Sequence, residues 1–115
     1  MKKLLLILLV LVLASCISGP PHLNSEQLAR AEKITVFEKG KKVQRPYQKI
    51  QELSSADCSS VSGYTGEETV ALFNLKKKAV YLGADAIINM SCGTSPLIND
   101  CWAPKTCSGI AIKWN

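Results

Sequence analysis

The chain has 115 residues, of which 47% are hydrophobic and 20% are charged, and its formal net charge is +5. This length fits one small domain with a modest core and leaves no room for a large multidomain enzyme. The mild excess of positive charge does not by itself point to nucleic acid as a partner.

The N-terminal residues 1–15 have the layout of a secretory signal peptide. Met1–Lys3 are positively charged, Leu4–Val12 are uninterrupted Leu, Ile and Val, and small residues precede Cys16. The apolar run is too short for an ordinary transmembrane helix, which needs about 20 residues; an uncleaved anchor helix is the weaker alternative. The Leu-Ala-Ser-Cys ending resembles a bacterial lipobox. That resemblance implies that Cys16 is acylated and becomes the first residue of the mature chain.

The residues after Cys16 predict a membrane-proximal tether. Ile17 stands where Asp would retain a lipoprotein in the inner membrane under enterobacteria-like sorting, which predicts the outer membrane, with the domain facing the periplasm. Ser18–Pro21 are typical of a linker, and Asn24–Lys33 is either a short helix or a disordered spacer. We therefore assign residues 16–33 to the lipid anchor and tether, and residues 34–115 to a periplasmic domain.

The chain holds five cysteines, of which Cys16 is assigned to the lipid. The other four form an even set in an oxidising compartment, which predicts two disulfides. Four cysteines allow three pairings, and their spacing does not choose among them. A zinc site or a thioredoxin-like redox site is a weaker alternative, because both favour a C-x-x-C pair that this chain lacks. The four are Cys58, Cys92, Cys101 and Cys107.

The first half of the domain predicts two strands followed by a helix. Ile34–Phe37 is rich in β-formers and leads into a polar turn, and Tyr47–Leu53 is a second strand. The spacing of Thr65 and Glu68 predicts a capping box at the start of a helix that runs to about Leu82. The apolar residues of this helix fall on one stripe at helical spacing, and a glycine suited to a left-handed stop follows. These residues are Ala71, Leu72, Leu75, Ala79, Leu82 and Gly83.

The second half predicts two more strands. Ala86–Met90 is a strong strand that leads into Cys92, and Gly93–Lys105 is a loop. Gly109–Trp114 alternates, with its large apolar side chains on one face. The predicted fold is α+β: a small four-stranded sheet with one packed helix in the order β-β-α-β-β, stapled by disulfides.

Several of these residues carry a resemblance to the RcsF family of outer-membrane lipoproteins. They are the Asp57-Cys58 pair, the phrase Gly-Ala-Asp-Ala-Ile-Ile at 83–88, Ser91-Cys92, Cys101, and the phrase Cys-Ser-Gly-Ile-Ala at 107–111. The resemblance covers 34–115 and the lipobox. It implies a sensor of envelope or lipopolysaccharide stress that relays the signal by protein contact to an inner-membrane component of a phosphorelay. It also implies association with the barrel-assembly machine or with porins.

The family pairs its four cysteines in a crossed pattern, which here implies Cys58–Cys101 and Cys92–Cys107. RcsF proteins also carry a long Pro-rich linker between lipid and domain. This chain differs, because only about 17 residues separate Cys16 from Ile34.

The candidate partner contacts are two basic clusters and one tryptophan. The first cluster lies in a polar turn and the second on the helix, and either suits lipopolysaccharide phosphates or an acidic partner; solvated charge is the plainer reading of both. Trp102 is a contact residue if exposed, and packing against a disulfide is the alternative. The clusters are Lys39, Lys41, Lys42 and Arg45, and Lys76, Lys77 and Lys78.

The sequence does not point to catalysis. His22 is the only histidine and lies in the predicted tether, so no Cys–His or Ser–His–Asp constellation is available. Asp57, Asp85 and Asp100 are scattered, and no phosphate-binding glycine motif occurs. We therefore expect a monomeric binding protein with no cofactor, metal or nucleic acid. The rival hypothesis is an envelope lipoprotein that binds a small ligand or metal without a signalling role.

Overall fold

The computed structural model describes residues 22–59, 65–96 and 101–115, so the predictions for the signal peptide, Cys16 and Asp100 lie outside the described residues. Two helices and four strands form the described fold. No helix of the described residues is long and apolar enough to cross a membrane. The elements are α2 (Ser25–Lys33), β1 (Thr35–Glu38), β2 (Tyr47–Asp57), α3 (Glu68–Tyr81), β3 (Ala86–Thr94) and β4 (Lys105–Trp114).

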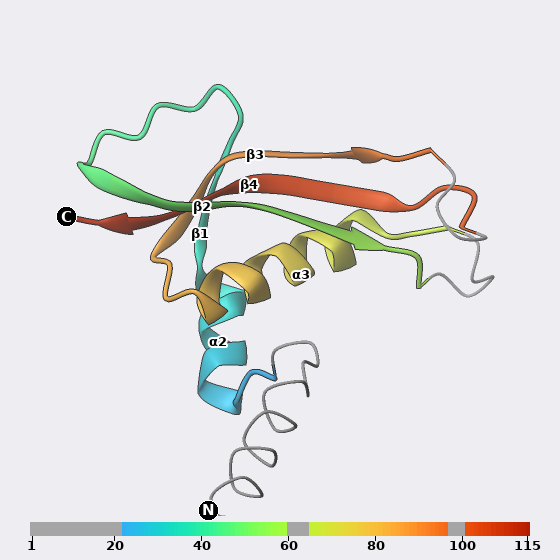
Figure 1. The fold of residues 1–115 in the computed structure, drawn as a ribbon, viewed down its shortest axis with the longest axis horizontal. Coiled ribbons are helices and arrows are strands. Elements are labelled where there is room, and N and C mark those ends of the chain that lie inside the picture. The colour runs from blue at the N-terminus through green and yellow to red at the C-terminus, as the bar shows by residue number, and fades with distance from the viewer. Residues whose placement is uncertain (1–21, 60–64, 97–100) are drawn as a thin grey trace, which may run out of the picture.

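The strands form one mixed sheet in the order β1-β3-β4-β2. β1 runs parallel to β3, whereas β4 is antiparallel to both β3 and β2. Helix α3 lies along one face of the sheet, and α2 packs against α3 beneath β1 (Figure 1). The predicted α+β fold with a four-stranded sheet and a packed helix is confirmed, and α2 adds a second helix.

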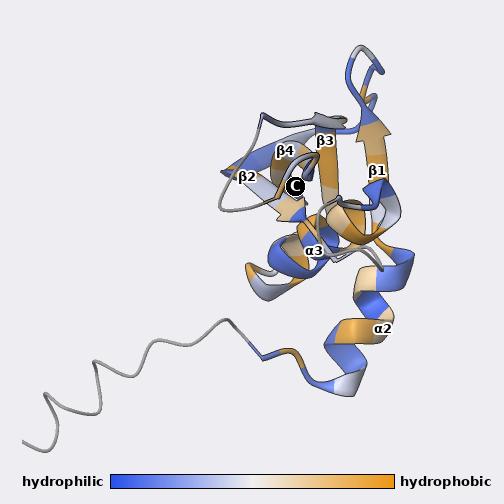
Figure 2. Cartoon of the chain, turned by 90° about the vertical axis from the view of Figure 1, so that its right-hand side faces the viewer, coloured by the Kyte–Doolittle hydropathy of each residue, from blue (hydrophilic) through white to orange (hydrophobic). Residues whose placement is uncertain are grey.

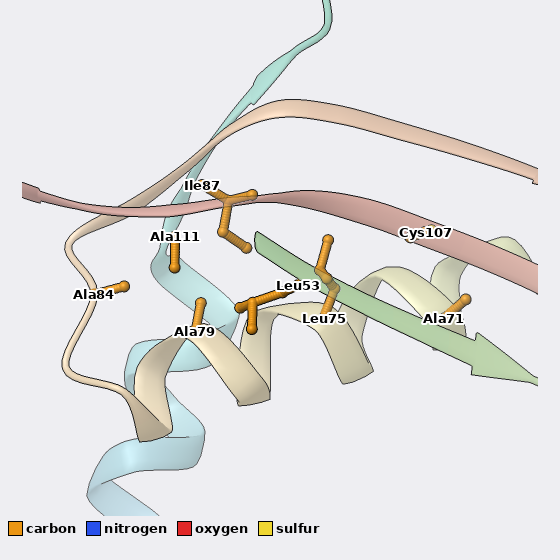
Figure 3. Packing of buried hydrophobic residues seen from close by; sticks show 8 residues of the cluster. All are labelled: Leu53, Ala71, Leu75, Ala79, Ala84, Ile87, Cys107 and Ala111. Atoms are coloured by element: carbon orange, nitrogen blue, oxygen red, sulfur yellow. The ribbon is translucent and has the colours of Figure 1, made fainter. Parts of the chain in front are cut away.

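The main core lies between α3 and the sheet. The helix contributes Ala71, Leu75 and Ala79, which follow the apolar stripe of the sequence and are completely buried. They meet Leu53 of β2, Ile87 of β3 and the β4 residues Cys107 and Ala111 (Figure 3). Small side chains on the helix let it approach the sheet closely, so Leu75 and Ile87 fill most of the space between the layers.

The opposite face of the sheet, which we call the open face, carries a second apolar cluster. Ala86, Ile88 and Ile112 are buried there under partly buried side chains. The cover includes Phe37 from β1 and Trp114 from β4, whose rings meet edge to face at a centroid distance of 6.3 Å. No described helix covers this face, and the hydropathy of the strands and helices is drawn in Figure 2. The remaining covering residues are Val43, Tyr47 and Ile110.

The segment 24–33, predicted as either helix or spacer, is the helix α2. Asn24 and Gln27 form a reciprocal capping box, with the Gln27 N–H donating to Asn24 Oδ1 at 2.8 Å and the Asn24 N–H to Gln27 Oε1 at 3.0 Å. Ala31 is completely buried, and α2 contacts α3. The described fold therefore begins before Ile34, and part of the predicted tether is packed against the domain.

The capping box predicted for Thr65 and Glu68 is wrong. Helix α3 begins at Glu68 with Glu67 as its N-cap, and no cap side chain bonds to the first turn. The predicted end is confirmed, because Gly83 follows the helix with a φ of +78°. Strands β2, β3 and β4 are longer than predicted: β2 continues to Asp57, and the predicted loop at 93–105 begins and ends as strand.

Two strands each contain one extra residue relative to β4. In β2 the register shifts between Lys49 and Gln51, and in β3 it shifts between Ile88 and Ser91. Asn89, inside the β3 irregularity, has a φ of +54°, a left-handed conformation that Asn tolerates better than most residues. Such bulges bend a strand and change which of its side chains face each side of the sheet.

Candidate interaction site

The structure joins Cys58 to Cys101 and Cys92 to Cys107, the crossed pairing that the resemblance implies. Cys92 and Cys107 face each other directly across β3 and β4, with their Cα atoms 4.1 Å apart. This bridge joins two strand positions, whereas Cys58–Cys101 joins the residue that follows β2 to a residue that precedes β4. We call the two bridges and the strand ends around them the bridged end of the sheet.

Trp102 follows Cys101 of the first bridge and is 71% exposed, so most of its side chain faces solvent. The backbone on each side of it is fixed. Cys101 is in a disulfide, the Ala103 carbonyl accepts from the Gly66 N–H at 2.9 Å, and the Pro104 carbonyl accepts from the Ser95 N–H at 2.9 Å. The indole is therefore displayed by a short segment that is fastened on both sides.

Gly66 explains how the chain fits together at this end. A Cβ atom at this position would lie 2.7 Å from the Lys105 nitrogen and would collide with the Asp57 carbonyl oxygen. Only glycine allows the segment before α3 to pass so close to the end of β2 and the start of β4. No local sequence pattern marks this glycine, because the requirement comes from strands distant in the chain.

Asp57 is the last residue of β2 and is buried. One oxygen, Oδ2, accepts from the Glu67 N–H at 2.8 Å and from the Ser59 N–H at 3.3 Å. A hydrogen bond from the Ser59 side chain and the bond from the Glu67 N–H hold the pKa of Asp57 below its usual value, against the opposing effect of burial. The carboxylate thus accepts a hydrogen bond from the N-cap of α3 and lies at the helix N-terminus, where the helix dipole favours negative charge.

The first basic cluster lies in the connection from β1 to β2. Lys39, Lys41, Lys42 and Arg45 are all exposed, and we call them the basic turn. The connection is ordered by backbone bonds, with the Lys39 N–H donating to the Met90 carbonyl and the Lys41 N–H to Glu38. The Arg45 guanidinium lies over the Trp114 ring at 4.8 Å, a cation–π contact between residues too far apart in the chain for a local pattern to indicate it. The basic turn and the bridged end lie at opposite ends of the sheet (Figure 1).

The second basic cluster is not a single patch. Lys78 donates to the Ser54 carbonyl at 2.6 Å, while the Lys77 ammonium lies over the Phe73 ring at 5.3 Å. Lys76 is only partly exposed. Successive helix positions point about 100° apart, so three adjacent lysines cannot share one face.

Two surface hollows of about 350 Å³ border the helices. One lies between α2 and α3 and is lined by side chains of both charge signs, including Arg30, Lys33 and Asp85. The other lies between β2 and α3. Within the described ranges, no group of three or more His, Cys, Asp or Glu side chains is arranged to hold a metal ion. His22 is exposed before α2.

The fold and its surfaces define a small disulfide-bonded α+β domain. No protein-family model matches this chain, and no curated protein matches it. Among solved structures, it is similar to a DUF74-family protein of unknown function from Pediococcus pentosaceus, with a TM-score of 0.43 and 18% sequence identity. The alignment covers 72% of this chain and 99% of the Pediococcus protein. A likeness at this level carries no information about activity.

Proposed function

We propose that this protein is an outer-membrane lipoprotein, anchored through Cys16, that resembles RcsF and signals by protein contact. It senses envelope or lipopolysaccharide stress and relays it to an inner-membrane component of a phosphorelay. The observation that carries the proposal is the exposed Trp102 on a segment fastened beside a crossed pair of disulfides. The crossed cysteine order is the most specific part of the resemblance.

The Trp102 segment has the properties of an interface anchor. Tryptophan is enriched among the residues that contribute most to protein–protein binding, because burying its large ring against a partner is strongly favourable. Because the backbone on both sides of Trp102 is already fixed, binding through this ring costs little backbone entropy. Within the proposal, Trp102 is the main apolar contact with the partner.

The basic turn supplies a second contact of different character. Its exposed cations attract an acidic partner or lipopolysaccharide phosphates and accelerate encounter more than they lengthen the life of the complex. Such exposed charges are screened beyond about 8–10 Å at physiological salt. Binding through the turn should therefore weaken as salt is raised, whereas binding through Trp102 should not.

The packing of α2 limits the reach of the proposed tether. Measured to the start of α2 instead of Ile34, the stretch from Cys16 is about nine residues, which span at most about 30 Å. The proposal therefore places the first contacts close to the outer membrane, with the barrel-assembly machine or porins as partners there. Contact with the inner-membrane regulator then requires that the regulator reach toward the anchored domain.

An envelope-stress reporter in a strain lacking this protein tests the proposal. Wild-type protein should restore the response, Cys16→Ala should lose lipid labelling and the response, and Trp102→Ala should reduce both the response and partner crosslinking. Leu28→Ala, at another exposed apolar residue (39% exposed), is the matched control and should behave as wild type. An intact response in the deletion strain, with no envelope partner crosslinked, would contradict the proposal.

The hollow between α2 and α3 favours a second candidate, a lipoprotein that binds a small ligand. Arg30 and Lys33 line it together with Glu26 and Asp85, a mixture suited to a small zwitterionic molecule. This candidate predicts that Arg30→Ala abolishes function while Trp102→Ala does not. The same reporter strain distinguishes the two candidates by which variant fails.

A further inference from the structure

β2 is an edge strand of the sheet, paired with β4 on one side. It is 11 residues long, and no other strand of the described residues pairs with its second side. A long edge strand presents a row of unpaired main-chain N–H and C=O groups, which proteins normally protect. How β2 is protected therefore shows which part of the edge is available.

The pairing register tells which groups of β2 point outward. The 4.1 Å Cα separation of Cys92 and Cys107 marks a closely spaced, non-hydrogen-bonded pair, so the main-chain groups of Cys107 point toward β2. Ser55 faces Cys107, so its main-chain N–H and C=O groups bond to β4. The main-chain groups of its neighbours Ser54 and Ala56 therefore point away from β4, toward the free edge. Two side chains of α3 agree with this assignment: Lys78 Nζ donates to the Ser54 carbonyl at 2.6 Å, and Asn74 Nδ2 to the Ala56 carbonyl at 3.5 Å.

Helix α3 thus covers only the C-terminal half of the edge. By the same alternation, the N–H and C=O of Glu52 point outward, and beyond the irregularity at 49–51 so do those of Lys49. No hydrogen bond joins the outward groups of Glu52 to another described residue. The N-terminal half of β2 therefore offers free main-chain groups to another chain.

A hollow runs beside this open stretch. It lies between residues 51–54 of β2 and the last turn of α3, and Leu53, Tyr81 and Leu82 line it. Tyr81 is 55% exposed, although it is one of the largest apolar side chains of the helix. Lys78 borders the hollow where its contact with Ser54 closes the groove. In Figure 2, β2 forms the sheet edge opposite β1, with α3 beneath the sheet.

We propose that the groove between β2 and the C-terminal half of α3 binds an extended peptide segment of a partner protein, which adds to the sheet as a strand beside Tyr47–Leu53. Main-chain hydrogen bonds to Glu52 and Lys49 hold such a strand, and one apolar side chain of the peptide fills the hollow beside Tyr81. This surface is separate from Trp102 and the basic turn, and the inference does not rest on the proposed function.

The charges around the groove define the chemistry of the peptide. Exposed Lys49 lies toward the N-terminal end of the open stretch of β2, and Lys78 lies beside Ser54 at its other end. Glu52 is the one carboxylate among the residues that line the hollow. A peptide with an apolar centre and a carboxylate at each end complements this arrangement, and a peptide with terminal cations does not. The occupant is therefore an acidic, β-forming segment.

Titration of the full chain, purified in detergent, with short capped peptides of alternating Val and Thr tests the proposal. One peptide ends in Asp at both ends and a matched peptide ends in Lys. The Asp peptide should bind, protect the Glu52 amide from hydrogen exchange and shift the Tyr81 resonances, and the Lys peptide should bind at least about tenfold more weakly. An Asp peptide with alternate N-methyl groups, which cannot pair with an edge, should not bind.

Glu52→Pro removes the outward N–H without breaking the β2–β4 ladder, so it should weaken binding of the Asp peptide by about tenfold or more. Glu52→Ala keeps the N–H and should bind as well as wild type or better, and thermal unfolding checks that both variants fold. Equal binding of the methylated peptide, or of Glu52→Pro, would overturn the proposal. So would dimerisation of the free protein that Glu52→Pro abolishes, since the edge would then belong to a second copy.

Discussion

The two ends of the sheet are stabilised by different interactions, apolar burial at one end and disulfides with a buried carboxylate at the other. At the packed end, Ile87 and Ala111 on one face and Ile88 and Ile112 on the other are buried by helices, loops and aromatic rings. At the bridged end, many strand residues are exposed and polar, and two disulfides and Asp57 hold the chain. The contrast shows how a small domain can extend a sheet to the margin of its apolar core, where covalent links add to the limited burial.

Removing the longer bridge should have the largest effect. Cys58→Ser together with Cys101→Ser opens a link between residues separated by 43 positions. The chain-entropy relation gives a loss of about 4 kcal/mol in the free energy of unfolding. Denaturant unfolding measures the loss. Hydrogen exchange should show protection lost first around Trp102 and Gly66, while the amides of Ile87 and Ala111 keep theirs longest.

Ser108→Ala, an exposed substitution at the same end, is the control for the bridge variant and should change stability by less than about 0.5 kcal/mol. If the bridge variant is still folded and its amides lose protection equally at both ends, the sheet opens as a single unit. The distinction between the two ends would then be wrong.

Leu75→Ala should weaken the packed end by about 3 kcal/mol. The side chain is completely buried between α3 and the sheet, and its truncation leaves a cavity that small neighbours cannot fill. Thermal and denaturant unfolding should both report the loss, and Leu28→Ala on the exposed side of α2 should cost far less. A cost below about 1 kcal/mol would mean that the helix contributes little to stability and the bridges dominate throughout.

Ser55→Ala tests the contact between the bridged end and the start of α3. Ser55 is buried on β2, and its hydroxyl donates to the Ala71 carbonyl of α3 at 2.6 Å. Its loss should cost about 1 kcal/mol, because the hydrogen bond disappears but the carbonyl keeps its place in the helix. The exposed neighbour Ser54→Ala should be nearly neutral, and urea unfolding of the two variants side by side makes the comparison.

Asp57→Asn should have the smallest effect at neutral pH, about 0.5–1 kcal/mol, which is typical of a charge at a helix N-terminus. The pKa of Asp57 is lowered in the folded state, so its contribution is present above the ordinary carboxyl value of about 3.9 and is lost as the pH falls from there through the folded pKa. Wild-type stability should therefore decline more steeply on acidification below about pH 5 than that of Asp57→Asn. Parallel acid profiles of the two proteins would contradict this role.

The sequence predicted the packed end better than the bridged end. Apolar periodicity at Ala71, Leu75 and Ala79 located α3, and the run at 86–90 located the middle of the sheet. The polar continuations of β2 to Asp57 and of β3 to Thr94 show no hydrophobic alternation, so they were missed. Their pairing depends on the facing strand and on the disulfide, neither of which leaves a local pattern.

The start of α3 and the surface residues show the same limit. Thr65 and Glu68 match a capping box locally, but Asp57 of β2 accepts from the Glu67 N–H instead. The three helix lysines share a run in the sequence but not a direction in space. The exposed Trp102 lies in a segment whose next two carbonyls accept from the Gly66 and Ser95 N–H groups. No pattern around Trp102 indicates these bonds.

The irregularity at Asn89 decides on which side of the sheet Cys92 lies. In an unbroken strand, Ile88 and Cys92 are both even-numbered and would point to the same side. The extra residue between Ile88 and Ser91 reverses the alternation of side chains between the two faces of the sheet. Ile88 therefore lies on the open face, while Cys92 lies with Cys107 on the side of α3. Odd and even positions of β3 thus exchange roles halfway along the strand. Deleting one residue there would turn Cys92 to the wrong side, and all four cysteines would remain present but two could no longer meet.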